Sequence, residues 1–325
     1  MEGVGLKLSV VVASHDRPLR LRWLLNALEE QTLDRSLWEV VVAHDSSGPE
    51  TEALLRSHPL AAAGVLKHLT FAPGPGPAAK RNAAWRLARG EAIVFTDDDC
   101  RPPADWLPSA LAAIERSPGA IVQGTTRVDP DELAVRQHAP HARSQEVTPP
   151  TPFAQTCNIA YPRALLERVG GFDEALPLAA GEDTDLAIRV QALGASLVAA
   201  PEVVTYHAVE ATTLPARLRE TWRWQHLAYI VRRHPELRAH MPLRLFWKPS
   251  HAALPLALMG LSLSRRRPLA LLLAAPWVAI ARPSYGSNPR GIARAASELP
   301  ARLAIDVVET AAMARGAVRH RTPML

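Results

Sequence analysis

Ile93-Val94-Phe95-Thr96-Asp97-Asp98-Asp99-Cys100 is an apolar run that stops abruptly in three consecutive carboxylates. The apolar part predicts a buried strand, whereas a packed core does not tolerate three aspartates without a cation or hydrogen-bond donors to meet them. We therefore expect the carboxylates at the exit of the strand. In open α/β sheets this is the edge where ligands bind, and it suits a metal ion that holds a phosphorylated substrate. The alternative is an acidic turn that caps a helix.

The segments before this strand predict an alternation of strands and helices. Leu6–Ala13 and Glu39–Ala43 are valine-rich apolar runs, typical of strands that are covered on both faces. Between them, leucines spaced i, i+3, i+4 and i+7 from Leu21 predict a helix that runs to about Gln31. This is a βαβ unit, whose crossover should be right-handed.

The pattern continues up to the triple aspartate. We expect a helix from Pro49, a third strand over Leu66–Phe71 and an irregular loop at Pro73–Pro77. Ala78–Arg89 then reads as a helix that Gly90 ends. The helix leads directly into the strand that carries the aspartates.

Composition excludes a disordered chain and a disulfide-built one. The 325 residues are 48% hydrophobic, enough for a sizeable core and about two domains. Cys100 and Cys157 are the only cysteines, and we expect them to be small buried hydrophobes. Met1-Glu2-Gly3 carries neither a basic n-region nor an apolar h-region, so we expect a cytosolic protein.

The charge is divided unevenly along the chain. Residues 1–214 carry 19 Lys and Arg against 27 Asp and Glu, whereas residues 215–325 carry 18 against 5. A basic segment attracts nucleic acid or anionic lipid. Because apolar runs lie beside these arginines, we expect an anionic membrane surface as the partner and no nucleic acid.

Seven motifs follow one another in a recognisable order. They are Ser14-His15-Asp16-Arg17, Asp45, Lys80-Arg81-Asn82, Asp97-Asp98-Asp99, Gly170-Gly171-Phe172-Asp173, Gly181-Glu182-Asp183-Thr184-Asp185 and Tyr206-His207. In this order they resemble the bacterial-type, inverting family-2 glycosyltransferases of the GT-A fold. The resemblance implies an α/β catalytic domain at residues 1–212, with a Rossmann-like mixed sheet flanked by helices. A helical, basic and apolar region, membrane-associated, would follow at residues 213–325.

The resemblance also implies how a nucleotide-sugar donor is held. Asp99 would be the principal metal ligand together with Asp97 and His207, and Asp97 would also lie near the ribose. The residues implied to bind the donor are Ser14, Arg17, Asp45, Lys80, Arg81, Asp97, Asp98 and Glu182. Hard oxygen ligands favour Mg²⁺ or Mn²⁺, and such a cation stabilises the diphosphate as the glycosidic bond breaks.

Several of these residues have plainer alternatives. Asp45, implied to accept a hydrogen bond from the base, could cap the next helix, and Lys80 and Arg81 could lie on a solvated helix face. His207, at the end of a strand expected over Val203–His207, could be structural. Ser46-Ser47-Gly48 follow Asp45, where the family commonly has a second acid and a glycine. This departure leaves the identity of the donor's nucleotide base open.

Asp183 is the residue that the resemblance implies as general base. It precedes a helix with an apolar stripe, so the alternative is a helix cap. A base at this position would take the proton of the acceptor hydroxyl, and direct attack on the anomeric carbon would invert its configuration. Glu182 would orient the acceptor or the neighbouring backbone. The Pro-rich segment Asp129–Pro152 is expected to be a mobile lid or an acceptor-side loop.

The C-terminal part predicts helices that lie on a surface. Leu214–Arg238 has the aromatic and basic residues of an interfacial amphipathic helix, although a helix packed on the catalytic domain fits equally. The apolar runs Ala252–Leu263 and Leu269–Ala281 have 12 and 13 residues, fewer than the ~20 of a spanning helix. We expect a shallow hairpin on the cytoplasmic face of the membrane, with a dimerisation surface as the alternative.

Together these patterns predict a metal-dependent enzyme that moves one sugar from a nucleotide donor to a hydroxyl of a lipid-linked or cell-surface glycan. Trp222-Arg223-Trp224-Gln225 resembles only loosely the element of processive polysaccharide synthases, so we do not expect a processive enzyme. A sugar-phosphate nucleotidyltransferase is a rival, but the loop after the first strand lacks its glycines. A non-catalytic membrane-bound scaffold that keeps the fold is the rival from another class.

Overall fold

The computed structural model describes residues 5–176 and 178–325 of the chain. It separates into two compact units, Met1–Ala211 and Thr212–Leu325. The sequence-based boundary lay between residues 212 and 213. Each unit has apolar clusters of its own.

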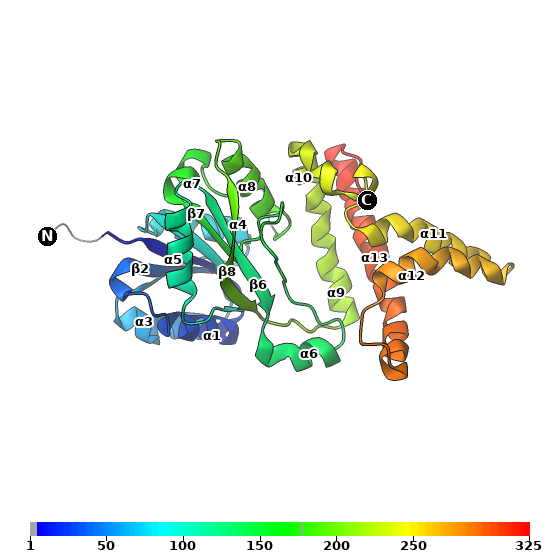
Figure 1. Ribbon diagram of the computed structural model, residues 1–325, viewed down its shortest axis with the longest axis horizontal. Coiled ribbons are helices and arrows are strands. Elements are labelled where there is room, and N and C mark those ends of the chain that lie inside the picture. Colours follow the sequence, from blue (N-terminus) through cyan, green and yellow to red (C-terminus); the bar gives the residue numbers. More distant parts are fainter. Residues whose placement is uncertain (1–4, 177) are drawn as a thin grey trace. The chain divides into compact units, whose positions relative to one another are not determined.

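The first unit is built on one mixed sheet with the strand order β3-β2-β1-β4-β7-β6-β8-β5. Strands β1 to β4 run parallel, whereas β7 pairs antiparallel with both β4 and β6 (Figure 1). The strands are β1 (Leu8–Ser14), β2 (Trp38–His44), β3 (Leu66–Thr70), β4 (Ala92–Asp97), β5 (Cys100–Arg101), β6 (Ile121–Val128), β7 (Asn158–Pro162) and β8 (Leu197–His207). This confirms the predicted α/β fold with a mixed sheet.

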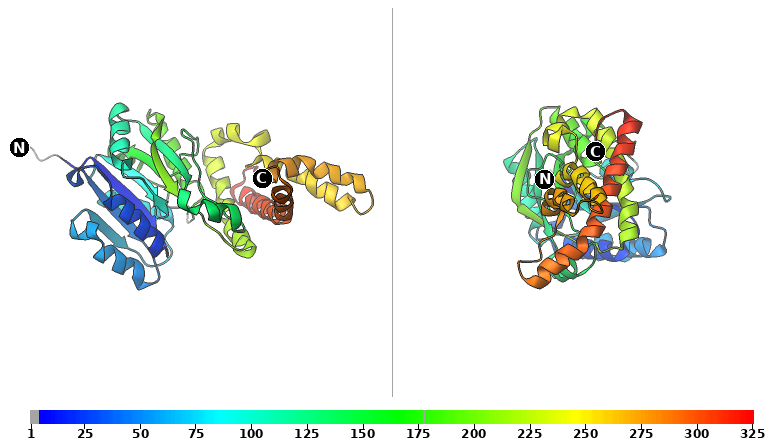
Figure 2. Two further views of the ribbon diagram at one scale, coloured as in Figure 1. Left: turned by 60° about the horizontal axis from the view of Figure 1, so that its bottom comes forward. Right: turned by 90° about the vertical axis from the view of Figure 1, so that its right-hand side faces the viewer.

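Helices cover both faces of the sheet, as the continuous apolar strands require. In β1, Leu8, Val10 and Val12 join one apolar cluster and Val11 joins the other. The first cluster includes side chains of α1 (Pro18–Glu29), α2 (Pro49–Ser57), α3 (Pro59–Ala62) and α5 (Trp106–Arg116). The second includes those of α4 (Pro77–Leu87), α7 (Arg163–Val169) and α8 (Glu182–Gln191). The first view of Figure 2 shows helices on either side of the strands.

The parallel strands β1, β2 and β4 end at one edge of the sheet. Ser14 closes β1 beside His44 of β2, and Ala13 is paired with Asp97 of β4. The loops that begin with His15, Asp45 and Asp98 therefore open at the same edge.

Two segments of this unit differ from their sequence-based expectation. Strand β8 begins at Leu197 instead of Val203 and runs through Pro201, where its register with β6 shifts between Gly124 and Thr125. Proline is tolerated at such an irregularity because its missing N–H interrupts the ladder there anyway. Asp129–Pro152 is not one irregular loop, since it contains a 3₁₀ turn and α6 (Leu133–His138).

The second unit is entirely helical. Instead of one helix over Leu214–Arg238, the chain forms α9 (Leu214–Thr221), a 3₁₀ turn (Trp222–His226), α10 (Leu227–Arg233) and a further 3₁₀ helix (Pro235–His240). The break has a tertiary cause: a Cβ on Gly316 of α13 (Pro289–His320) would lie 2.1 Å from the carbonyl oxygen of Gln225, so the two backbones touch there.

The two short apolar runs pair as a helical hairpin. They form α11 (Pro249–Leu263) and a 3₁₀ helix (Pro268–Ala274) continued by α12 (Ala275–Ala281), which run side by side in Figure 2. A Cβ on Gly260 would lie 2.6 Å from the carbonyl oxygen of Ala270, so glycine permits this close approach. Among the described residues, no helix combines the length and the apolar character needed to cross a membrane.

Candidate active site

The three aspartates at the end of β4 point to different partners. The Asp98 carboxylate accepts hydrogen bonds from the Ser14 hydroxyl at 2.7 Å and the His15 backbone N–H at 3.4 Å. Burial raises the pKa of Asp98 to about 6, and the charge of Asp99 adds to this shift. Asp97 instead accepts a hydrogen bond from the Arg81 guanidinium at 3.0 Å.

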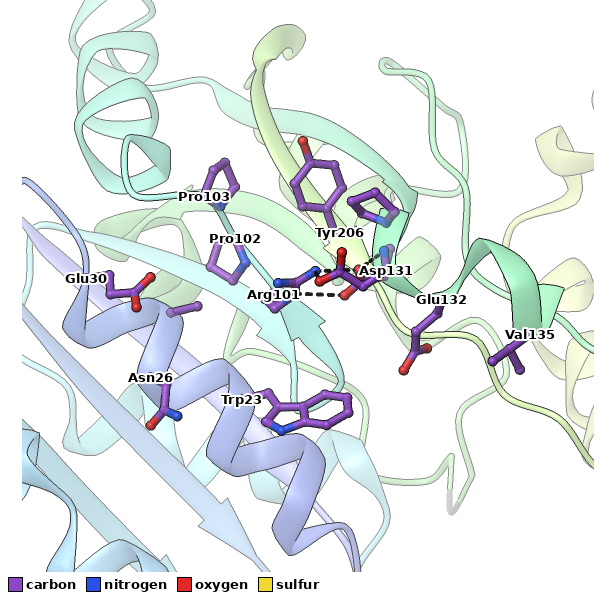
Figure 3. Close-up of a pocket in the computed structure, with 13 residues that line it drawn as sticks. Trp23, Asn26, Glu30, Arg101, Pro102, Pro103, Asp131, Glu132, Val135 and Tyr206 are labelled. Carbon is purple, nitrogen blue, oxygen red and sulfur yellow. Dashed lines mark hydrogen bonds and ion pairs between the residues drawn. The ribbon is translucent and has the colours of Figure 1, made fainter.

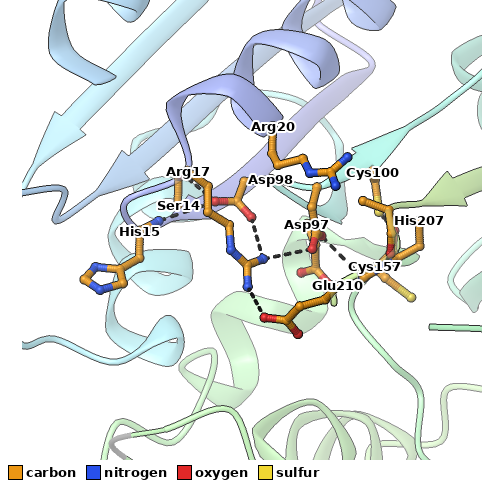
Figure 4. A network of polar contacts seen from close by, with 12 residues as sticks. Ser14, His15, Arg17, Arg20, Asp97, Asp98, Cys100, Cys157, His207 and Glu210 are labelled. Atoms are coloured by element: carbon orange, nitrogen blue, oxygen red, sulfur yellow. Dashed lines mark hydrogen bonds and ion pairs between the residues drawn. The ribbon is translucent and has the colours of Figure 1, made fainter. Parts of the chain in front are cut away.

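Arg17 brings positive charge to this cluster. Its guanidinium lies 2.8 Å from Asp99 and 3.5 Å from both Asp98 and Glu210 (Figure 4). Burial would lower the pKa of Arg17, but the surrounding carboxylates outweigh it and raise that pKa. Arg143 donates to the same Glu210 carboxylate at 2.8 Å, so the predicted lid segment also reaches the cluster.

Asp99 and His207 lie close together and form a candidate cation site. His207 Nε2 is 3.3 Å from Asp99 Oδ1, while Nδ1 donates to the Ala208 carbonyl at 3.0 Å. That second bond fixes the ring and its tautomer, as backbone carbonyls do for metal-bound histidines. The Nε2 atom therefore faces the Asp99 carboxylate, and these two atoms are close enough to be ligands of one divalent cation.

Among the described residues, one other potential metal ligand lies near this pair. Cys100 lies beside Asp99 and His207, but burial raises the pKa of its thiol well above the ordinary value. The thiol is therefore a poor ligand, which leaves a carboxylate oxygen of Asp99 and an imidazole nitrogen of His207 to hold a divalent cation. Burial also raises the pKa of Asp99, which a bound cation would counteract. The Asp99 carboxylate and the His207 imidazole thus offer two ligands for the implied divalent cation.

Asp45 and Lys80 form a buried ion pair behind the aspartates. Lys80 also donates to the Ser14 backbone carbonyl at 3.0 Å, and the Asp45 carboxylate accepts from the Gly74 N–H at 3.4 Å and lies 3.0 Å from His15 Nδ1. Burial opposes the charge of Asp45, yet the Lys80 ammonium outweighs it and lowers the pKa of Asp45. Lys80 is thus neither on a solvated face nor exposed toward a phosphate.

Arg81 connects the aspartates to the predicted general base. Besides Asp97, its buried guanidinium binds Glu182 at 2.9 Å, and the second Glu182 oxygen accepts from the Ala180 N–H at 2.9 Å. Glu182 therefore orients the backbone just before α8, one of the two roles expected for it. Asp183 is the next residue along the chain.

Asp183 is half-buried in the first turn of α8, which starts after Gly181 in a left-handed conformation. Its carboxylate accepts a hydrogen bond from the Thr184 N–H at 3.0 Å. Burial raises the pKa of Asp183 to about 7, and the neighbouring Glu182 charge adds to the shift while Arg81 opposes it. A carboxylate of this pKa is well suited to take a proton near neutral pH.

Two motifs of the sequence prove to support the site. The Asn82 amide donates to the Phe172 carbonyl at 2.9 Å and accepts from the Phe172 N–H at 2.8 Å. Gly171 has φ +83°, and a Cβ there would lie 2.3 Å from Asn82 Oδ1. Lys80-Arg81-Asn82 is thus joined to Gly170-Gly171-Phe172-Asp173, which holds Arg81 in place.

The predicted residues fall into two connected groups. One runs from Asp45 and Lys80 through Ser14 and Asp98 to Arg17, Asp99 and His207; the other joins Asp97 to Glu182 and Asp183 through Arg81. Sequence reasoning missed Glu210, which meets Arg17 and Arg143, and the structural part of Asn82. No local pattern marks Glu210, because both of its partners come from distant segments.

Comparison with known proteins finds two family models and several relatives that match the chain. Residues 9–170 match the family described as Glycosyl transferase family 2, and residues 92–282 match Glycosyl transferase family group 2. The O-antigen biosynthesis protein RfbC of Myxococcus xanthus is 27% identical over 67% of this chain and 18% of its own length. Validoxylamine A glucosyltransferase of Streptomyces hygroscopicus is 28% identical over 74% of this chain and 63% of its own length. The chain thus spans less than two thirds of either relative.

Solved structures share the fold at low sequence identity. The mannosyltransferase PcManGT of Pyrobaculum calidifontis, solved with GDP-Man and Mn²⁺, has a TM-score of 0.59 and 23% identity, covering 97% of this chain and 87% of that one. Staphylococcus aureus TarS residues 1–349, solved with UDP-GlcNAc, has a TM-score of 0.53 and 20% identity, covering 98% and 93%.

Proposed function

Since the chain belongs to the family-2 glycosyltransferases, we propose that it is an inverting, metal-dependent enzyme that transfers one sugar from a nucleotide donor to an acceptor hydroxyl. One observation carries the proposal. Arg81 bridges Asp97 of the carboxylate cluster to Glu182 beside Asp183, whose pKa is raised to about 7. The carboxylate cluster and Glu182, the residue just before the proposed base, are thus held by the same guanidinium.

On the donor side, each residue acts through the contacts described above. Asp99 and His207, with Asp97, would hold Mg²⁺ or Mn²⁺, which as a Lewis acid stabilises the charge that grows on the leaving diphosphate. The positive charge of Arg17 partly neutralises Asp98 and Asp99, and its guanidinium can donate hydrogen bonds to a phosphate of the donor. Asp45, held by Lys80, keeps an ionised carboxylate available for a base N–H. Ser14 and Asp98 fix the turn between these groups.

On the acceptor side, Asp183 takes the proton of the attacking hydroxyl. The oxygen then forms its bond to the anomeric carbon as the bond to the diphosphate breaks, so the electron pair leaves with the nucleotide and the configuration inverts. Glu182 and Arg81 position the backbone and charge around Asp183. No covalent enzyme intermediate is needed.

The acceptor we propose is a lipid-linked or cell-surface glycan, reached from the cytoplasmic face of the membrane. The α11–α12 hairpin supports this proposal because large apolar side chains on it are exposed, with Leu269 at 80% and Leu272 at 70%. Arg265, Arg266 and Arg267 lie exposed in the turn between the helices. Apolar side chains beside cations are the combination that anionic lipid surfaces attract.

A thermal-shift panel tests the donor site. The melting temperature of the full chain would be followed with UDP, GDP, CMP and dTDP derivatives, with and without Mn²⁺. We expect one nucleotide to stabilise the fold only with Mn²⁺, and the Asp99→Asn variant to lose that dependence. Asp34→Asn, an exposed aspartate distant in sequence from the cluster, is the matched control and should behave as wild type. A folded wild type that no nucleotide stabilises would support a non-catalytic scaffold instead.

A further inference from the structure

A cavity in the first unit is lined by residues other than those assigned to the candidate active site. It has a volume of about 800 Å³, within the range of small-molecule sites. Trp23 of α1 and Glu30, which caps the end of that helix, line it on one side, and Arg101 of β5 and Tyr206 of β8 on the other (Figure 3). Because side chains alternate along a strand, Tyr206 and Arg101 face away from their neighbours His207 and Cys100. The cavity and the Asp99–His207 pair therefore lie on opposite sides of these two strands.

The cavity walls offer hydrogen-bonding groups that the protein leaves unused. Among the described residues, no hydrogen bond joins the Trp23 indole N–H, the Tyr206 hydroxyl or the Glu30 carboxylate to another side chain or backbone group. Trp23 is 39% exposed, and the Arg20 guanidinium 4.9 Å from its ring centre holds the ring in place. The lining thus combines two aromatic rings with free donors and acceptors.

The cavity lining carries more negative than positive side chains, and this charge disfavours anionic ligands. Glu30, Asp129, Asp131 and Glu132 contribute four carboxylates, against Arg101 in the lining and Arg20 beside it. Arg101 is already held by Asp129 at 2.6 Å and by Asp131 at 2.6 Å. This excess of negative charge repels phosphates, uronic acids and anionic headgroups. A neutral polyol meets no such repulsion, and its hydroxyls match both the free donors and the free acceptors.

From these features we propose that the cavity is a binding site for a neutral glycan, separate from the catalytic centre. The ring of a hexose would lie against Trp23 or Tyr206 with its apolar face, and its hydroxyls would bind Glu30, Asp131 and the indole N–H. The site goes beyond the transfer reaction, since binding there requires no turnover. It would hold a part of a glycan chain that is distant from the reacting end.

The cavity wall is also joined to the catalytic backbone. Glu132 pairs with Arg20 and accepts from the Val209 N–H at 2.5 Å, and the preceding Ala208 N–H donates to the Asp99 carbonyl at 2.9 Å. A glycan seated in the cavity would therefore contact Glu132, which is hydrogen-bonded to the segment that connects His207 to Glu210.

Ligand-observed NMR titration of the full chain tests the proposal. The probes are mannotriose and N,N′,N″-triacetylchitotriose as neutral glycans, a trigalacturonate as the anionic one and spermine as the cationic one. We expect saturable binding of a neutral probe and none of the anionic probe. Trp23→Ala should weaken it about tenfold or more, and Tyr206→Phe about two- to tenfold.

Two controls separate this site from the catalytic one. Trp222→Ala removes a tryptophan of similar exposure, 41%, from the second unit and should leave binding unchanged. Asp183→Asn should also bind the glycan as wild type does, whether or not the transfer reaction is as proposed. Absence of binding of both neutral probes, binding of spermine alone, or affinity unchanged by both Trp23→Ala and Tyr206→Phe would overturn the proposal.

Discussion

Asp183 sets the pH at which the proposed reaction runs. Burial and the Glu182 charge raise its pKa to about 7, and a protonated carboxyl cannot accept the proton of the acceptor. We therefore expect kcat/KM to fall about tenfold per pH unit below pH 7, instead of below pH 4 as for an ordinary aspartate. Initial rates measured between pH 5 and 9 check this. A rate that stays constant down to pH 5 would argue against Asp183 as the base.

Lys80 is a second residue whose role can be measured. Its removal leaves Asp45 buried without a counter-charge, and breaking a buried pair on one side costs about 3–5 kcal/mol. We expect Lys80→Met to lower the free energy of unfolding by about this amount in urea titrations. Adding Asp45→Asn should recover part of the loss.

A surface pair provides the control for this experiment. Lys7 and Glu91 are also bonded, at 2.9 Å, but both are exposed, so Lys7→Met should cost no more than about 1 kcal/mol. Equal effects of Lys80→Met and Lys7→Met would mean that Asp45 and Lys80 contribute no more than a solvated pair.

Residue types could be read from the sequence more readily than residue partners. The ends of predicted parallel strands had to meet at one edge, so the convergence of Ser14, Asp45 and Asp97 follows from the pattern alone. The internal pairing of Lys80 with Asp45, and of Arg81 with Glu182, does not follow. Those contacts depend on side-chain directions that are set only when α4 packs against the sheet.

At the scale of elements, the turn after α7 determines how α4 is held. Gly171 combines φ +83° with a close approach to Asn82, so Gly171→Ala strains both the backbone and the contact. We expect a loss of about 2–4 kcal/mol in chemical denaturation, from backbone strain and the displaced hydrogen bond. Gly119 has φ +78° in open space, and Gly119→Ala should cost only about 1 kcal/mol. A smaller loss at Gly171 than at Gly119 would contradict this account.

Which elements were predictable also has a physical basis. Strands β1, β2 and β4 are buried on both faces, so a continuous apolar run identifies them locally. The break in the helix predicted over Leu214–Arg238 comes from the contact of Gly316 with Gln225, about ninety residues apart, and no local pattern contains it. The predicted start of β8 at Val203 was likewise wrong. Proline was expected to lie outside the strand, but a register shift between β6 and β8 accommodates Pro201 within it.

At the scale of the whole molecule, the uneven charge predicts where the protein resides. We expect the full chain to sediment with vesicles that contain phosphatidylglycerol and not with phosphatidylcholine alone, and to dissociate as salt rises. Replacing Arg265, Arg266 and Arg267 with Gln should weaken binding strongly, at about 1 kcal/mol for each charge.

The matched control changes the same net charge in the other unit. Arg35, Arg116 and Arg168 are exposed there, and their replacement by Gln should leave vesicle binding nearly unchanged. If both triple variants bind as wild type, the arginines of the hairpin turn do not face lipid.

The central claim is that metal-assisted transfer depends on Asp183. The most direct measurement is the release of nucleoside diphosphate from UDP-sugars and GDP-sugars by the full chain, with water or a glycan as acceptor. After removal of metal with EDTA we expect no release, and after addition of Mn²⁺ we expect release from one donor. Asp183→Asn should reduce that rate by about 10²-fold or more while still binding the nucleotide. Release that is indifferent to Mn²⁺ and equal in the Asp183→Asn variant would contradict the account.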